Sequence, residues 1–488
     1  MKFGLVSGDG LPISGLLTIF RNVLDIGITD GLVELPVPAD LGYSWRPDKG
    51  DFYPRGAIVD GYPSWLHVLD SSSVVTAVHG DLPERWQDLR RQVARATDLT
   101  AGERADLRSR IAAMTTGYRD YFLRWLAEYD VDWVVAVNMT LSDAVPVTAG
   151  LHAAVRARYG SGGRPGGVLF WDHDLFGSCA IVEDGQRVYP AAPNEFTPLP
   201  TAEDHVRWVV ISEELAAEAR EYPTDAVPRV LPNVLPTVPT GHLEERHHAF
   251  LRQHGLAPDR PLVLVPVRMF RIKGVEIAVE VFAAARAACV RSGLPAPYLL
   301  VFGSLEEDAD YAAEVLALIR ELRVEEDVVL LGGVPLGSYQ DGGGRWRLDE
   351  VDLLRVAASR DGLVLFTPNV TDVETIGLGP ALASAAGLPS AVTPYDAFDQ
   401  VYGSDFRCLR LGATAGSRSG AGSEVARALH DPASRLGAGG GATNRAALDR
   451  IFPTEPWRRM LHDLQAHLSG EADTRSLPAT PAPSFSQT

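Results

Sequence analysis

Short apolar segments alternate with helix-like stretches twice along this chain, on either side of a proline-rich segment at 228–242. Strand candidates lie at 3–8, 131–138, 166–174 and 206–212 in the first half, and at 261–267, 298–304, 328–334 and 362–368 in the second. Strands that alternate with helices predict a parallel sheet covered on both faces. Because the pattern restarts after the prolines, we predict an α/β protein with two doubly wound domains facing across a cleft. A ligand is expected at the carboxyl ends of the strands.

The proline-rich segment separates a first domain, residues 1–239, from a second domain, residues 240–448. A further helix is expected at 449–469, and a tail follows at 470–488. We expect the amphipathic C-terminal helix to pack back on the first domain. The tail is rich in Ser, Thr and Pro, and we expect it to be disordered. The segments 337–347 and 413–443 are expected to be soft insertions, and the first helix is expected to end at Gly27.

Charge, hydropathy and cysteine content disfavour nucleic-acid-binding, membrane-spanning and disulfide-rich proteins. The net charge of −18 disfavours nucleic acid and anionic membranes as partners. No apolar run approaches the roughly 20 residues of a membrane helix, and the first residues lack the features of a signal peptide. The three cysteines lie far apart, which disfavours a disulfide framework. We therefore expect a cytoplasmic protein without an integral membrane segment; the sequence leaves the oligomeric state open, with a homodimer as one option.

A basic motif follows the first strand of the second half. Arg268 and Lys273 stand between that strand and a helix, in the spacing R-x4-K-G, and Lys273 is one of only three lysines in the chain. Helix-start N–H groups and nearby cations favour anions, so this junction suits a phosphate group. The alternative interpretation is an ordinary solvated loop between a strand and a helix.

A second motif lies at 365–394, where a strand leads into a loop and then a helix of small residues. Gly377 permits a close backbone approach, and the N–H groups after it could bind a phosphate. Glu374 could accept hydrogen bonds from sugar hydroxyls. Alternatively, Glu374 is only a favourable charge at the start of a helix.

The first half offers weaker candidates. His173 follows a strand, and it is either a site residue or a structural histidine held by Asp172 or Asp174. Asn138 and Ser142 lie in another strand-end loop. Acidic triplets at 172–174 and 306–310 suggest a metal site only superficially, because 63 acidic residues in 488 produce several such triplets by chance. We therefore predict no metal.

Together the two motifs of the second half resemble the signature of family 4 retaining glycosyltransferases, which have the GT-B fold of two Rossmann-like domains. The resemblance is closest over 240–400. It implies that Arg268 and Lys273 bind the diphosphate of a nucleotide sugar and that Glu374 contacts the transferred sugar. It also implies backbone contacts to phosphate and sugar from Ile376, Gly377, Leu378 and Gly379.

The same resemblance assigns roles in the first half. A histidine placed like His173 contacts the donor sugar near its reacting carbon. The loop at 8–15 is similar to the family's glycine-rich loop, with Ser14 and Gly15 in place of two glycines. We include both among the nucleotide-binding residues, together with Val334 at the end of a predicted strand.

Two positions depart from the family pattern. Val267 replaces the glycine that usually precedes the arginine. Leu382 replaces a glutamate that commonly binds the ribose, eight positions after Glu374. An apolar side chain at 382 either faces the ribose without a hydrogen bond or packs into the core.

The expected activity is transfer of a sugar, with retention of configuration, from a GDP- or UDP-sugar to a small-molecule acceptor, without a metal or other cofactor. The excess of Ala, Gly and Arg over lysine suggests that the acceptor is a specialised metabolite such as an antibiotic. Alternatives with the same fold are a trehalose-phosphate-synthase-like or pseudoglycosyl coupling enzyme and a nucleotide-sugar 2-epimerase. A non-catalytic sugar-nucleotide-binding protein is a further alternative.

Overall fold

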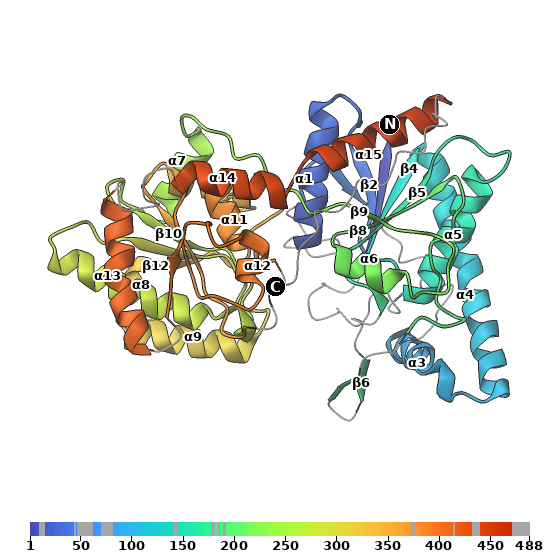
Figure 1. The fold of residues 1–488 in the computed structure, drawn as a ribbon, viewed down its shortest axis with the longest axis horizontal. Helices are drawn as coiled ribbons and strands as arrows, with labels where there is room; N and C mark the ends of the chain where they lie inside the picture. The colour runs from blue at the N-terminus through green and yellow to red at the C-terminus, as the bar shows by residue number, and fades with distance from the viewer. Residues whose placement is uncertain are drawn as a thin grey trace.

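The computed structural model describes residues 1–8, 15–42, 45, 62–69, 82–140, 144–176, 181–183, 186–188, 192–371, 374, 376–412, 415–431 and 440–470. These residues form two lobes, each built around a parallel sheet with helices packed on it (Figure 1). The predicted tail lies outside the described residues, apart from Gly470. None of the described helices combines the length and the apolar character that a membrane crossing needs.

The N-terminal lobe contains a seven-stranded sheet in the order β3-β2-β1-β4-β5-β8-β9, with every pairing parallel. The strands are β1 (Phe3–Ser7), β2 (Val37–Asp40), β3 (Leu66–Val68), β4 (Trp133–Val137), β5 (Gly167–Asp172), β8 (Val206–Val210) and β9 (Arg229–Val230). Every residue of β1, β4 and β5 is buried, because helices cover both faces of the sheet. Strand β9 lies within the proline-rich segment 228–242, so that segment begins in the sheet of the N-terminal lobe.

The helices of this lobe are α1 (Gly15–Thr29), α3 (Leu82–Ala94), α4 (Ala101–Glu128), α5 (Val145–Tyr159) and α6 (Glu213–Ala219), and β6 (Ile181–Glu183) and β7 (Gln186–Val188) form a separate hairpin. The predicted end of the first helix was wrong, because α1 continues through Gly27 to Thr29. A Cβ at Gly27 would lie 2.5 Å from Cγ2 of Val33. This glycine therefore allows a close approach of the chain and does not end the helix.

The C-terminal lobe contains a six-stranded sheet in the order β12-β11-β10-β15-β16-β17, again parallel. Its strands are β10 (Leu262–Val265), β11 (Tyr298–Val301), β12 (Val328–Leu330), β15 (Leu363–Phe366), β16 (Ser390–Val392) and β17 (Leu409–Arg410). Its helices are α7 (Glu245–Gln253), α8 (Val275–Arg291), α9 (Ala309–Glu321), α10 (Glu350–Ala358), α11 (Leu378–Ala385), α12 (Phe398–Tyr402), α13 (Ala415–His430) and α14 (Gly440–Ile451).

Both predicted insertions contain regular structure. The segment 337–347 includes an antiparallel pair, β13 (Tyr339–Gln340) with β14 (Trp346–Arg347). Helix α13 occupies much of 413–443, and its Val425 and Leu429 are buried in the same core cluster as α8. Burial of these apolar side chains outweighs the loop-like composition of the segment.

The last helix, α15 (Glu455–Ser469), packs on the N-terminal lobe beside α1 (Figure 1). Its buried side chains join the core of that lobe, and they are Trp457, Met460, Leu461 and Leu464. The indole N–H of Trp133 donates to the carbonyl of Leu464 at 3.2 Å, and that of Trp457 donates to the carbonyl of Pro232 at 2.9 Å. The chain thus returns to the N-terminal lobe after it completes the C-terminal one.

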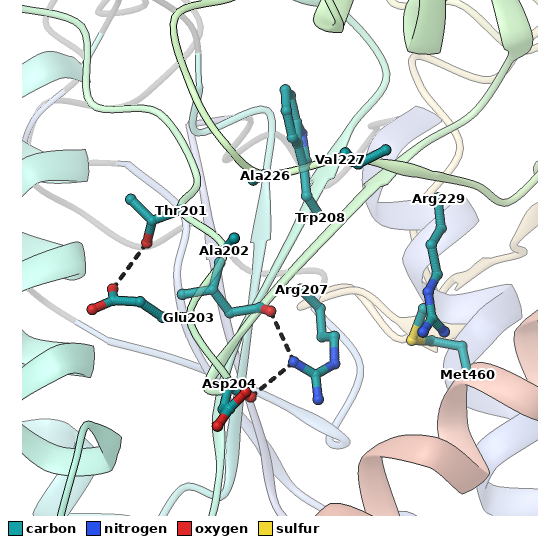
Figure 2. Close-up of a pocket in the computed structure, with 11 residues that line it drawn as sticks. Thr201, Ala202, Glu203, Asp204, Arg207, Trp208, Ala226, Val227, Arg229 and Met460 are labelled. Carbon is teal, nitrogen blue, oxygen red and sulfur yellow. Dashed lines mark hydrogen bonds between the residues drawn. The ribbon is translucent and has the colours of Figure 1, made fainter. Parts of the chain in front are cut away.

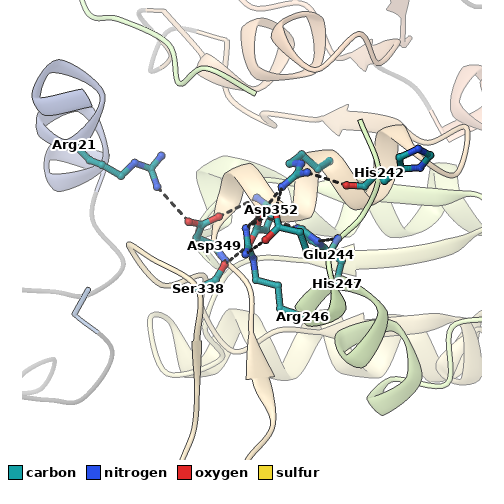
Figure 3. Close-up of polar contacts among 9 residues, drawn as sticks. Arg21, His242, Glu244, Arg246, His247, Ser338, Asp349 and Asp352 are labelled. Atoms are coloured by element: carbon teal, nitrogen blue, oxygen red, sulfur yellow. Dashed lines mark hydrogen bonds and ion pairs between the residues drawn. The ribbon is translucent and has the colours of Figure 1, made fainter. Parts of the chain in front are cut away.

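A buried arginine connects the two lobes. Arg21 of α1 donates to the carbonyl of Leu336 at 3.0 Å, and its Nη1 lies 3.8 Å from the Asp349 carboxylate (Figure 3). Asp349 in turn caps α10 by accepting from the N–H of Asp352 at 2.9 Å. This contact places the middle of α1 close to the loops of the C-terminal lobe.

Candidate functional site

The turn that carries Lys273 is fixed by the neighbouring strand end. Between β10 and α8 the chain makes a short 3₁₀ turn, Arg271–Lys273, and Gly274 then adopts φ 60°. A Cβ at Gly274 would lie 2.0 Å from the carbonyl oxygen of Thr367, so only glycine fits. The Thr367 hydroxyl donates to the Gly274 carbonyl at 2.8 Å. The loop after β10 is therefore bound to the loop after β15.

This arrangement brings two predicted residues together. Nζ of Lys273 donates to Oε1 of Glu374 and forms an ion pair with it. The side chains are 25% and 10% exposed, so the pair is largely shielded from solvent and only weakly screened. An anion that binds here would share or replace the carboxylate as partner of the ammonium group.

Arg268 lies in the same loop but has a different partner. Its Nε donates to Glu307 at 2.6 Å, and its guanidinium lies over the ring of Phe270 at 4.6 Å. Glu307 is one of the acidic residues at 306–310 that the sequence analysis dismissed as a chance cluster. Because such clusters are common in this chain, only the structure could identify its contact.

The start of α11 is held by two tyrosines that the sequence did not indicate. Gly377 adopts φ 63° and caps the helix, and a Cβ there would lie 2.4 Å from the Tyr395 hydroxyl. Tyr395 donates to the carbonyl of Ile376 at 2.5 Å, and Tyr402 donates to the carbonyl of Gly377 at 2.7 Å. Burial raises the pKa of both hydroxyls, so they keep their protons and stay donors.

These bonds orient the backbone of the predicted phosphate-binding segment. The first N–H groups of a helix have no partner within it, and they carry the positive end of the helix dipole. Gly379 adds a close contact, since a Cβ there would lie 2.3 Å from Cδ2 of Phe366. Leu378 packs against the C-terminal core and against the N-terminal cluster that takes in Leu336. The start of α11 thus faces the region where the lobes meet.

The remaining positions that the sequence singles out lie in different environments. Leu382 is 4% exposed and packs in the core with Leu264 and Val364, so its side chain occupies the core position. Val334 belongs to the same cluster, which leaves only its backbone to contact a ligand. Gly15 is the first residue of α1, and Ser14 lies outside the described residues, as does Ser142.

His173 belongs to the other lobe, directly after β5. Its ring packs against Trp171, with 5.0 Å between the ring centroids, and its backbone N–H donates to the side chain of Asn138 at 2.7 Å. Asn138 also donates to Asp174 at 3.2 Å and has φ 52°, which is unusual for a residue with a side chain. Asn138 therefore connects the carboxyl ends of β4 and β5.

Asp172, next to His173, is wholly buried. It accepts a hydrogen bond from the indole of Trp208 at 2.8 Å. Burial raises the pKa of this carboxyl to about 7, although the hydrogen bond opposes the shift. In the part of the chain that the structure describes, no three His, Cys, Asp or Glu side chains are grouped as a metal site.

A pocket of about 250 Å³ lies elsewhere, between the amino ends of β8 and β9 and Met460 of α15 (Figure 2). Arg207 lines it and donates to the carbonyl of Asp204 at 2.8 Å. Ligands of such sheets bind at the opposite edge, where the strands end. This pocket therefore lies outside the candidate site.

Several solved structures have the same architecture. A glycosyltransferase from Rickettsia africae has a TM-score of 0.52 and 12% identity, over 96% of this chain and 98% of that one. Sucrose-phosphate synthase from Thermosynechococcus elongatus has a TM-score of 0.52 and 16% identity, over 96% and 100%. HepE from Anabaena, in complex with UDP and glucose, has a TM-score of 0.50 and 14% identity, over 95% and 98%.

No family model and no curated protein sequence matches this chain. At these identities the similarity shows the fold alone. The chain therefore has the two-domain GT-B fold of these glycosyltransferases, as the sequence analysis predicted.

Proposed function

We propose that this protein is a glycosyltransferase that takes a sugar from a nucleoside diphosphate sugar. The observation that carries the proposal is the Lys273–Glu374 ion pair, in which Glu374 stands three residues before Gly377, the glycine cap of α11. A cation and a helix start favour the binding of a diphosphate, and a carboxylate beside them can accept hydrogen bonds from sugar hydroxyls. The resemblance of these motifs to family 4 enzymes supports the same assignment.

The reaction breaks the bond between the anomeric carbon of the sugar and the diphosphate oxygen. Negative charge develops on that oxygen, and Lys273, Arg268 and the N–H groups at the start of α11 would stabilise it. The nucleophilic atom of the acceptor forms the new bond on the same face of the sugar, and its proton passes to the departing phosphate oxygen. The configuration is retained, and the protein need not supply a base.

The nucleotide, the acceptor and the roles of single residues can be proposed in more detail. UDP is one candidate nucleotide, since the Anabaena relative in fold is known with UDP-glucose, and GDP is the other. We propose that Arg268 and Lys273 take the place of a metal and that His173 contacts the sugar. The acceptor would be a small molecule in specialised metabolism. The widely spaced cysteines favour a cytoplasmic reaction.

The direct test is release of nucleoside diphosphate from a panel of UDP- and GDP-sugars, with and without a cell extract as acceptor source. We expect one nucleotide series to be turned over, with faster release when an acceptor is present. Binding of UDP or GDP without any release would instead indicate a non-catalytic sugar-nucleotide-binding protein. If the protein neither binds nor releases these nucleotides, the proposal is contradicted.

A further inference from the structure

Glu307 links two strand-end loops beside the proposed donor site. It follows β11, and its side chain is only 6% exposed. Besides the bond from Arg268, its carboxylate accepts from the backbone N–H of Met269 at 2.7 Å and from that of Ser304 at 3.3 Å. The carboxylate is therefore fixed from three directions, two of them by rigid backbone.

The contact uses one edge of the guanidinium and leaves the rest available. Only Nε of Arg268 donates to Glu307 at 2.6 Å, while the Arg268 side chain is 37% exposed. The two terminal nitrogens of an arginine carry four further N–H groups in a fixed plane. With Phe270 on one face and Glu307 at the Nε edge, those four N–H groups have a defined orientation.

We propose that Glu307 is a positioning residue, which holds Arg268 ready to bind the terminal phosphate of a nucleoside diphosphate. This inference rests on the proposed function. A free, half-exposed arginine loses side-chain freedom when it binds a ligand, whereas an arginine already held in place loses less. Charge that is aligned before the reaction also stabilises the leaving group without reorganisation.

The same loop offers a matched control. Arg271 donates to Glu314 at 2.8 and 2.6 Å, but there both side chains are more than half exposed. That pair has the same chemistry on the exposed surface, and within the described part of the chain no backbone N–H donates to the Glu314 carboxylate. An effect that is specific to Glu307 should therefore be absent at Glu314.

The test is Glu307→Asp, which keeps the charge but shortens the side chain, so that it cannot reach both Arg268 and the Met269 N–H. Calorimetric titration should show UDP affinity falling about tenfold while UMP affinity changes less than about twofold. GDP and GMP replace them if the protein binds guanine nucleotides. In an Arg268→Ala background the same substitution should have no effect on UDP affinity, because Glu307 acts through Arg268. Glu314→Asp should leave both affinities unchanged.

An equal loss for UDP and UMP, or an equal loss in the Arg268→Ala background, would show a general structural role and overturn the inference. If Glu307→Asp does not fold, Glu307→Gln keeps the length of the side chain, and its effect on UDP affinity must likewise disappear in the Arg268→Ala background. A wild-type protein that binds neither UDP nor GDP would contradict the proposed function instead. The two failures are therefore distinguishable.

Discussion

Lys273 and Glu374 form an ion pair across 101 residues of sequence, between the loop after β10 and the loop before α11. The two loops belong to adjacent strands of one parallel sheet, so their ends meet at the same edge. The pair gives the lysine a counter-charge until an anionic ligand arrives. It also places the carboxylate where a sugar attached to that anion could contact it.

Removal of either cation should slow sugar transfer. For Lys273→Ala and for Arg268→Ala we expect donor turnover to fall about 10² to 10³-fold, because each removes one preorganised charge from the leaving diphosphate. Arg271→Ala is the control, since Arg271 lies in the same turn but pairs with the exposed Glu314. Its turnover should stay within about twofold of wild type. Wild-type turnover in a folded Lys273→Ala variant would refute the assignment.

Chelation should leave activity intact. Two cationic side chains and a helix start can neutralise a leaving diphosphate, which is the role of a metal ion in other transferases. Release of nucleoside diphosphate in the presence of EDTA should match that of an untreated sample. A loss on chelation that Mg²⁺ or Mn²⁺ restores would show that the protein uses a metal.

Leu382→Glu should destabilise the protein. Leu382 is buried among apolar side chains, and an unpaired carboxylate there would cost at least about 3 kcal/mol of the free energy of unfolding. The control Leu382→Met preserves volume and should cost less than about 1.5 kcal/mol. Melting curves of wild type and the two variants measure the loss of stability that each substitution causes. A glutamate variant that melts like wild type and binds nucleotide more tightly would place residue 382 at the ribose.

Asp172→Asn should change how stability depends on pH. Burial raises the pKa of Asp172 from 3.8 to about 7, so the folded protein holds this proton more tightly than the unfolded chain. The free energy of unfolding should therefore fall as pH rises between about 4 and 7. Asparagine can still accept from Trp208 but carries no charge. Relative to wild type, the variant should gain about 1–3 kcal/mol between pH 5 and pH 8. An equal difference in the free energy of unfolding between wild type and variant at pH 5 and at pH 8 would contradict this prediction.

The sequence predicted the parts of the molecule that depend on local pattern. Alternation of strands and helices predicted both parallel sheets, and the rarity of lysine drew attention to Lys273. Contacts made only by tertiary packing were not predictable. The hydroxyls of Tyr395 and Tyr402 reach α11 from later elements, and nothing in their local sequence indicates this.

Predictions from composition were wrong where the burial of a few side chains determines the local structure. Glycine and serine suggested a loop over 413–443, but packing of Val425 and Leu429 stabilises a helix there. Acidic clusters are frequent in this chain, so the sequence does not distinguish Glu307 from other acidic residues, and only the structure shows its contact with Arg268. The sequence suggested Arg268 and Lys273 as candidate cations, whereas the contact of Arg268 with Glu307 required the fold.

The most direct test of the account is calorimetric titration of UDP and of GDP into the wild-type protein and into Lys273→Ala. We predict that one of the two nucleotides binds the wild-type protein, and that its affinity falls at least about tenfold in the variant, as expected for the loss of one charged hydrogen bond. Arg271→Ala should bind like wild type. Equal affinity in wild type and a folded Lys273→Ala variant, or no binding of either nucleotide, would contradict the claim that this site holds a nucleoside diphosphate.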